Sequence, residues 1–364
     1  MTATWRDLLR PELRASDAYE VPSPRGVRVR LDANENPYAT PPEVAADLAD
    51  VVRNASLHRY PDPGARELRA QLTRRLGVEG ETLVIGNGAD ECIAMVCACF
   101  GHPTPGRPAR IAYPAPTFVM YRTYAVIAGC EPLPVPLRSD FTLDEAALER
   151  AVAEHAPAVV FLSRPNNPTG GLWLRGMVQR LAERFPGTVV VSDEAYIDYA
   201  AQPDESAVSL LGHHPNLIVL RTLSKVGLAG LRLGFAIAAP DVARELNKVR
   251  GPYNVGTITQ QVAARILERH WEALRSSLAA IRAECKRLAA ALRARPEVEV
   301  FPSAANFVLC RFPDGNAVWR GLLDHGVLVR HYGAAGPLAH CLRITIGTPE
   351  ENNALLAALD AVRI

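Results

Sequence analysis

Short apolar runs alternate with segments of helical periodicity from about residue 82 onward, and this alternation constrains the fold more than any other feature of the sequence. Each run gives way to small or polar residues, and the runs are TLVIG, RIAYP, AVVFLS, TVVVSD and LIVLRT. Strands that alternate with helices are typical of α/β proteins with a parallel sheet. We therefore predict an α/β fold with a mainly parallel central sheet and helices on both faces.

The two ends of the chain favour a second, smaller domain. Residues 1–30 carry several prolines and little periodicity, which is typical of an extended arm, and a proline-started helix is expected from about 42 to 52. A long helical region at about 259–295 precedes a mixture of strands and helices. Because 364 residues suffice for two domains, we predict the following division. It comprises an N-terminal arm and the start of the small domain (1–50), a large domain (51–255), and a linking helix with a small C-terminal α+β domain (256–364).

Composition limits the partners that the chain can have. Forty basic residues stand against 39 acidic ones, so no global charge favours nucleic acid or an anionic membrane. The N-terminal residues lack the apolar core of a secretory signal, and Gly, Pro or charged residues interrupt the apolar stretches before they could span a bilayer. The seven cysteines form no pair of CxxC clusters, so we expect packed thiols and no metal site. These features predict a cytoplasmic protein that acts on small molecules.

A glycine-rich turn follows the first apolar run. Gly86 and Gly88 precede a helix expected from Ala89, and Asp90 lies in its first turn. A turn of this kind lets backbone approach an anion, and the helix presents unpaired N–H groups at its positive end. The turn lacks the third glycine of a dinucleotide fingerprint and the GK[ST] of a P-loop. It therefore predicts a phosphate site and favours neither NAD nor ATP.

The next three strand ends add an aromatic ring, an amide and a carboxylate. Phe118 and Tyr121 follow the second run, and each could either pack in the core or cover a flat heterocycle. Asn167 lies in the turn after the third run. Asp193 ends the fourth run, with Tyr196 three residues later. A buried Asp needs a cation or an N–H donor, although it could also simply cap a helix.

The fifth strand end carries the lysine. Lys225 follows the apolar run from residue 217, with Thr222 and Ser224 beside it and Arg232 seven residues further on. In α/β sheets, ligands bind outside the carboxyl ends of the strands. An amine, two hydroxyls and a guanidinium at this edge suit an anionic cofactor.

Together these groups match the requirements of pyridoxal 5'-phosphate. Its aldehyde needs a lysine, which would be Lys225, and its ring nitrogen needs an acid, which would be Asp193. Asn167 and Tyr196 could hydrogen-bond the ring oxygen, and Phe118 could stack on the ring. The phosphate would lie among the remaining groups, namely Gly88, Ala89, Asp90, Thr222, Ser224 and Arg232. We predict Lys225, Asp193 and Tyr196 to be the catalytic residues.

Several motifs in the same order also resemble a known family. LDANENPY, RYPDP, GNGADE, PTFVMY, PNNPTG, DEAYIDY, TLSK and CLRITIGTPEEN are similar to motifs of the histidinol-phosphate aminotransferase family, within the fold-type I aminotransferases. The resemblance implies transamination between L-histidinol phosphate and 2-oxoglutarate, which yields imidazole-acetol phosphate and L-glutamate. It further implies a homodimer in which Tyr60 reaches the cofactor phosphate of the neighbouring subunit. The substrate-binding residues that it implies are Tyr19, Asn34, Arg330 and Arg343.

Other functions use the same motifs. An aromatic amino-acid aminotransferase or a decarboxylase of a phosphorylated amino acid would share them, whereas a cofactor-binding regulator would need an added DNA-binding module, for which the N-terminal arm shows no pattern. Three departures from the family pattern concern the substrate, and one is the unusual segment RHYGAAGPLAH at residues 330–340. The segment between Lys225 and Arg232 is one residue shorter than in part of the family, and Arg164 replaces a small or neutral residue. We expect Arg164 to lie on the surface, with a place beside the substrate as the alternative.

Overall fold

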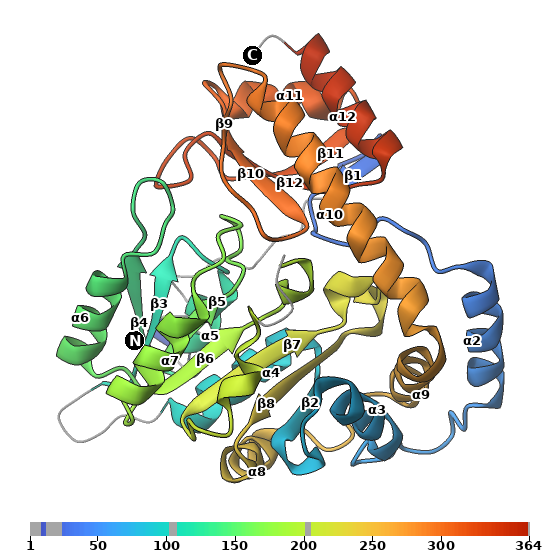
Figure 1. The fold of residues 1–364 in the computed structure, drawn as a ribbon, viewed down its shortest axis with the longest axis vertical. Helices are drawn as coiled ribbons and strands as arrows, with labels where there is room; N and C mark the ends of the chain where they lie inside the picture. The colour runs from blue at the N-terminus through green and yellow to red at the C-terminus, as the bar shows by residue number, and fades with distance from the viewer. Residues whose placement is uncertain (1–8, 12–23, 102–107, 201–204, 363–364) are drawn as a thin grey trace, which may run out of the picture.

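The computed structural model describes residues 9–11, 24–101, 108–200 and 205–362. Its larger sheet has seven strands in the order β2-β8-β7-β6-β5-β3-β4 (Figure 1). β8 alone runs in the opposite direction to the other six strands, so the prediction of a mainly parallel sheet is confirmed. In chain order the strands are β2 (Leu83–Asn87), β3 (Arg110–Ala115), β4 (Glu131–Pro136), β5 (Val159–Ser163), β6 (Val189–Asp193), β7 (Leu217–Thr222) and β8 (Leu233–Ala238).

Helices cover both faces of this sheet because successive side chains of its buried strands point to opposite faces. Val190 packs into one apolar cluster and Val191 into another, and neither is exposed. One cluster includes side chains of α3 (Arg66–Leu76), α6 (Glu145–His155) and α7 (Arg175–Arg184). The other includes side chains of α4 (Gly88–Phe100), α5 (Met120–Ile127) and α8 (Pro240–Val249). The two clusters fix the large sheet between two helical layers.

A second sheet of five strands lies beyond the carboxyl edge of the first, in the order β1-β11-β12-β10-β9 (Figure 1). Its strands are β1 (Val29–Leu31), β9 (Glu299–Val300), β10 (Phe307–Arg311), β11 (Val327–His331) and β12 (Cys341–Thr345). The end of the expected arm, at β1, pairs in parallel with β11 and buries Leu31. This N-terminal segment is therefore part of a packed layer, because it supplies an edge strand to residues almost three hundred positions later.

Helices connect and cover the two sheets. The chain leaves the large sheet through α9 (Thr257–Arg265), a π-helical turn (Ile266–His270) and α10 (Trp271–Arg293), where the sequence predicts one long helical region. Three further α-helices lie wholly within the described residues, namely α2 (Pro42–Asn54), α11 (Gly315–Asp324) and α12 (Pro349–Ala361). In the described ranges, no helix is both long and apolar enough to cross a membrane. The exact division into domains at residues 50 and 255 stays a prediction.

Candidate active site

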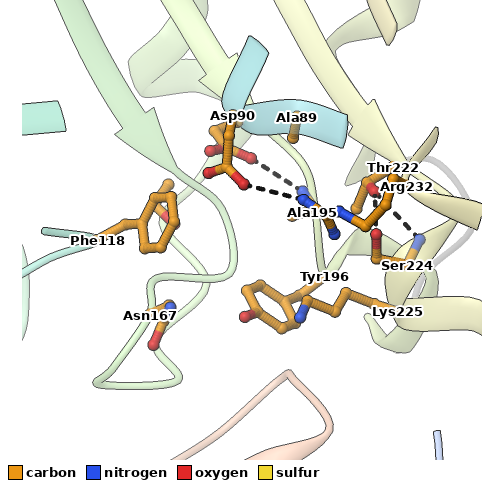
Figure 2. Close-up of a pocket in the computed structure, with 12 residues that line it drawn as sticks. Ala89, Asp90, Phe118, Asn167, Ala195, Tyr196, Thr222, Ser224, Lys225 and Arg232 are labelled. Carbon is orange, nitrogen blue, oxygen red and sulfur yellow. Dashed lines mark hydrogen bonds and ion pairs between the residues drawn. The ribbon is translucent and has the colours of Figure 1, made fainter. Parts of the chain in front are cut away.

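A pocket lies at the carboxyl ends of the parallel strands, and it brings together most of the residues that the sequence predicts (Figure 2). The predicted residues that line it are Ala89, Asp90, Phe118, Asn167, Asp193, Tyr196, Thr222, Ser224, Lys225 and Arg232. Ser163 and Ala195 also line it, although the sequence did not single them out. They are small residues at the ends of β5 and β6, and only their place directly beside predicted strand ends could have indicated them.

Lys225 enters the pocket just beyond the end of β7. A short 3-10 turn, Ser224–Val226, follows the strand and directs the lysine toward Tyr196, with its Nζ 5.7 Å from the centre of the tyrosine ring (Figure 2). The Nζ also donates a hydrogen bond to the carbonyl oxygen of Ala33 at 3.4 Å. Burial, and then the nearby charge of Arg343, lowers the pKa of Lys225 to about 8. A larger share of this amine is therefore neutral near pH 7 than for an ordinary lysine.

Asp193 is buried at the end of β6, with 4% of its surface exposed. Its Oδ2 accepts a hydrogen bond from the hydroxyl of Tyr121 at 2.6 Å, and its Oδ1 accepts one from the N–H of Ala195 at 3.1 Å. Burial raises the pKa of Asp193 to about 6. The expected N–H donor is present, and both carboxylate oxygens are held in place beside the pocket.

The glycine-rich turn and Arg232 form a cradle for an anion. Gly88 begins α4 with φ +82°, and a Cβ on it would lie 2.8 Å from Nη2 of Arg232. A side chain at this position would be strained by the positive φ and would displace the guanidinium. Arg232 also contacts Asp90 at 3.3 Å, and the hydroxyls of Thr222 and Ser224 lie 2.9 Å apart (Figure 2). Backbone N–H groups, hydroxyls and a guanidinium in one place suit a phosphate.

Two residues from the small-sheet side, Asn34 just after β1 and Arg343 of β12, contact side chains that line the pocket. Asn34 donates a hydrogen bond from its Nδ2 to the hydroxyl of Tyr196 at 3.0 Å. Arg343, in β12, donates from Nη1 to Oδ1 of Asn167 at 2.5 Å and from Nη2 to the carbonyl oxygen of Asp32 at 2.6 Å. Because the amide oxygen of Asn167 is engaged by Arg343, its NH₂ group is the part that can donate toward the pocket.

Gly88, Asn34 and Arg343 adjoin lining residues without being part of the lining, and three further predicted residues are not placed at the pocket. Arg330 is paired with Arg343 across β11 and β12. Tyr60 is 80% exposed and stacks on Tyr253, with ring centres 4.6 Å apart. Tyr19 lies outside the described residues. The pocket therefore brings together the cofactor-binding residues that were predicted to come from a single chain. The roles of Arg330, Tyr60 and Tyr19 remain proposals.

Arg164 is neither on the surface nor beside the pocket, so both expectations for it are wrong. Its side chain is fully buried, and Nε donates to the carbonyl oxygen of Trp173 at 2.7 Å. Nη2 lies 3.4 Å from a carboxylate oxygen of Glu205, and Nη1 lies 3.8 Å from one of Glu194. Nη1 also donates to the carbonyl oxygen of Glu205 at 3.2 Å. Two carboxylates and two carbonyls compensate for the loss of water around the guanidinium, and sequence spacing could not reveal these contacts.

The groups in the pocket fit pyridoxal 5'-phosphate. They supply an amine of lowered pKa, a buried carboxylate and a cradle at a helix terminus that a Cβ would fill. A two-sheet α/β fold with these groups at the carboxyl edge of the large sheet defines a pyridoxal-phosphate-dependent enzyme of fold type I.

Comparisons with known proteins narrow this class. Residues 28–359 match the family model of aminotransferase class I and II. Histidinol-phosphate aminotransferase of Chromobacterium violaceum is 43% identical over 361 residues, which cover 99% of each chain. Histidinol-phosphate aminotransferase 2 of Cupriavidus pinatubonensis is 43% identical over 97% of this chain and 96% of its own.

A solved structure agrees with these relatives. The crystal structure of histidinol-phosphate aminotransferase from Sinorhizobium meliloti, in complex with pyridoxal 5'-phosphate, superposes with a TM-score of 0.86 at 25% identity. The match covers 97% of this chain and 96% of that one. The chain belongs to the class I and II aminotransferase family and is a pyridoxal-phosphate-dependent aminotransferase.

Proposed function

We propose that this enzyme transfers the amino group of L-histidinol phosphate to 2-oxoglutarate, giving imidazole-acetol phosphate and L-glutamate in histidine biosynthesis. The observation that carries the proposal is the 43% identity to a histidinol-phosphate aminotransferase over 99% of both chains. A match of this extent includes the pocket as well as the strands around it.

Lys225 is the proposed general base. When bound, pyridoxal 5'-phosphate supplies an aldehyde that takes up the substrate amine and a ring that accepts electrons from the substrate carbon. Nζ of Lys225 accepts the proton that this carbon releases, because the lysine amine lies in the pocket and its pKa is lowered to about 8. A base whose pKa is near the working pH combines a useful neutral fraction with sufficient basicity.

Neighbouring side chains orient the reacting groups. The carboxylate of Asp193 is held by two donors and is available to the protonated ring nitrogen. Tyr196 receives a hydrogen bond from Asn34, so its hydroxyl hydrogen can point toward the ring oxygen. The NH₂ group of Asn167 can donate to the same oxygen. These contacts fix the ring while Lys225 moves the proton.

Arg343 is proposed to receive the anionic end of each substrate in turn. A guanidinium can bind a carboxylate or a phosphate through two parallel hydrogen bonds. Nε of Arg343 has no hydrogen-bond partner among the described residues, although the side chain is only 8% exposed. Arg330, opposite it in the neighbouring strand, adds positive charge for the phosphate of histidinol phosphate. Tyr19 is proposed to help close the site over the substrate.

A homodimer completes the proposal. Tyr60 and Tyr253 form a stacked pair, and 80% and 42% of their respective surfaces are exposed. Exposed aromatic pairs of this kind are typical of protein interfaces. We propose that Tyr60 reaches the cofactor phosphate of the second subunit. A cytoplasmic location is also proposed, since all seven cysteines are free thiols, as expected in a reducing compartment.

The test is a half-reaction without 2-oxoglutarate. Cofactor-loaded protein receives L-histidinol phosphate alone, then L-phenylalanine alone, while absorbance follows the conversion of the cofactor to its amine form. We expect fast conversion with histidinol phosphate and slow conversion with phenylalanine. The Lys225→Ala variant, which lacks the base, is the matched control and should show no conversion.

Two outcomes would contradict the proposed substrate. Faster conversion with phenylalanine would identify an aromatic amino-acid aminotransferase, and release of carbon dioxide from a phosphorylated amino acid would identify a decarboxylase. Size-exclusion chromatography with light scattering tests the dimer separately. A monomer with full activity would exclude the role of Tyr60 in a neighbouring site.

A further inference from the structure

Tyr121, in α5, connects two parts of the pocket without lining it. Its hydroxyl donates to Oδ2 of Asp193 at 2.6 Å. Its ring meets Phe118 edge to face, with ring centres 5.7 Å apart. Tyr121 thus contacts both the carboxylate proposed for the ring nitrogen and the aromatic side chain proposed to cover the ring.

Packing fixes the position of the Tyr121 hydroxyl. The ring is fully buried and stacks on Phe161 of β5, with ring centres 4.7 Å apart and an angle of 9° between the ring planes. Tyr113 lies against it at 6.2 Å between ring centres. Because aromatic rings confine the tyrosine on several sides, its hydroxyl cannot follow the carboxylate if Asp193 rotates. The N–H of Ala195 holds the other carboxylate oxygen.

We propose that Tyr121 is a positioning residue, whose hydroxyl fixes the direction of the Asp193 carboxylate and favours its ionised form, ready for the cofactor ring. The inference rests on the proposed role of Asp193. A hydrogen bond from a hydroxyl to a carboxylate is charge-assisted, and a donor to the charged form favours that form. Burial alone would favour the neutral acid, which cannot accept a hydrogen bond from a protonated ring nitrogen in the same way.

Several other ionisable groups lie close enough to Asp193 to interact with its charge, and they are the same in every variant considered below. They are Asp90 and Cys92 of α4, and Glu194 and Tyr196 in the segment that follows β6. The two carboxylates oppose ionisation of Asp193, whereas Tyr121 and the N–H of Ala195 favour it. The hydroxyl of Tyr121 is therefore the side-chain group whose removal should change the proton affinity of Asp193 most directly.

Tyr121→Phe tests the proposal because it removes the hydroxyl and keeps the ring. Binding of pyridoxamine 5'-phosphate to the apoenzyme is measured from about pH 5 to about pH 8, since this ligand cannot bond to Lys225. Affinity should fall at low pH as Asp193 takes up a proton. In Tyr121→Phe the fall should begin about one pH unit higher, because the charged form has lost a strong donor. The ionisations of the ligand itself are common to all variants.

Tyr113→Phe is the matched control. It removes a buried tyrosine hydroxyl from the ring next to Tyr121, and the pH profile should keep its wild-type position. Replacing Tyr121 with 3-fluorotyrosine gives a second test that preserves packing. Its more acidic hydroxyl is a stronger donor, so the profile should move in the opposite direction, to lower pH.

Unchanged profiles in both Tyr121 variants would overturn the inference. Asp193→Asn separates this failure from failure of the proposed function. If Asp193→Asn leaves binding and its pH profile unchanged, the role of Asp193 itself is wrong. If Asp193→Asn removes the acid fall while both Tyr121 variants behave like wild type, only the role of Tyr121 is wrong. Tyr121→Phe should have no further effect in the Asp193→Asn background.

Discussion

Asp193 and Glu194 are adjacent carboxylates at the end of β6, and both are buried, but their surroundings differ. Asp193 lines the pocket and accepts hydrogen bonds from a neutral hydroxyl and a backbone N–H. Glu194 accepts from the backbone N–H of Ala207 and lies near two guanidiniums, of Arg164 at 3.8 Å and of Arg221 at 3.7 Å. Glu194 therefore has cationic neighbours within the protein. Asp193 has no cationic group in contact with it among the described residues.

This difference distinguishes a ligand site from a structural charge cluster. A buried charge is costly unless it is paired, so a carboxylate left without a cation marks the place where a ligand can supply one. Glu194 and its arginines satisfy one another and leave nothing for a ligand. We therefore expect changes around Asp193 to affect activity, and changes around Glu194 to affect the free energy of unfolding.

Lys225→Ala should have the largest effect, because it removes the amine that bonds the cofactor and moves the proton. Turnover should fall to the background of the assay, as expected when a covalent and general-base group is lost. Steady-state transamination and the absorbance of the loaded protein measure this. Lys248→Ala is the control, since Lys248 is exposed in α8 and pairs with Glu245. Ordinary turnover in Lys225→Ala would refute the assignment of the site.

Asp193→Asn should lower kcat by about 10²–10³-fold, the usual cost of removing one preorganised electrostatic group. Although Asp193→Asn lowers kcat, it should raise the free energy of unfolding of the apoenzyme. Because the folded-state pKa of Asp193 is about 6, above its unfolded value, the folded protein binds more protons between these values and loses stability as the pH rises. Urea unfolding of the apoenzyme should therefore show Asp193→Asn to be more stable than wild type by about 3 kcal/mol at pH 8. This gain should disappear toward pH 4.

Arg164→Met tests the structural role of the charge cluster around Glu194. It removes the guanidinium that lies near both Glu194 and Glu205, so the free energy of unfolding should fall by about 3 kcal/mol even though Arg221 stays beside Glu194. The kcat of the folded, loaded enzyme should stay within about threefold of wild type, because Arg164 does not line the pocket. Urea denaturation and steady-state kinetics separate these two quantities. A large loss of kcat without loss of stability would place Arg164 in the catalytic machinery after all.

Much of the large domain was predictable because each strand is a local signal. The apolar runs and the polar residue at each run's end are contiguous in sequence, and parallel strands bring these ends to one edge of the sheet. Lys225, Asp193 and Asn167 could therefore be assigned to one site from the sequence alone. The prolines of β4 hid that strand, because proline is tolerated at a sheet edge but gives no strand signal.

The features that could not be predicted from the sequence depend on contacts between distant segments. The pairing of β1 with β11, and the hydrogen bonds that Arg343 makes to Asn167 and Asp32, join residues far apart in the chain. The burial of Arg164 also depends on Glu205, which is 41 residues away. Charge at a strand end was visible in the sequence, but the face of the sheet to which it pointed was not.

The smallest predicted effect is a shift in the pH profile of cofactor uptake through Lys225, and the wild-type profile provides the reference. Only a neutral amine can bond to the aldehyde of pyridoxal 5'-phosphate, and burial has lowered the pKa of this lysine to about 8. The rate at which the apoenzyme takes up the cofactor should therefore rise about tenfold per pH unit up to about pH 8 and then level off. Stopped-flow absorbance measures this rate.

Arg343→Met tests the origin of that pKa. Burial is its main cause and the charge of Arg343 comes next, so removing the guanidinium should move the plateau to slightly higher pH. Arg244→Met is the control, because Arg244 is exposed on α8 and pairs with Asp241. A rate that continues to rise toward about pH 10 in the wild-type protein would mean that Lys225 titrates like an ordinary lysine. The difference between the ligand pocket and the charge cluster around Glu194 would then depend on Asp193 alone.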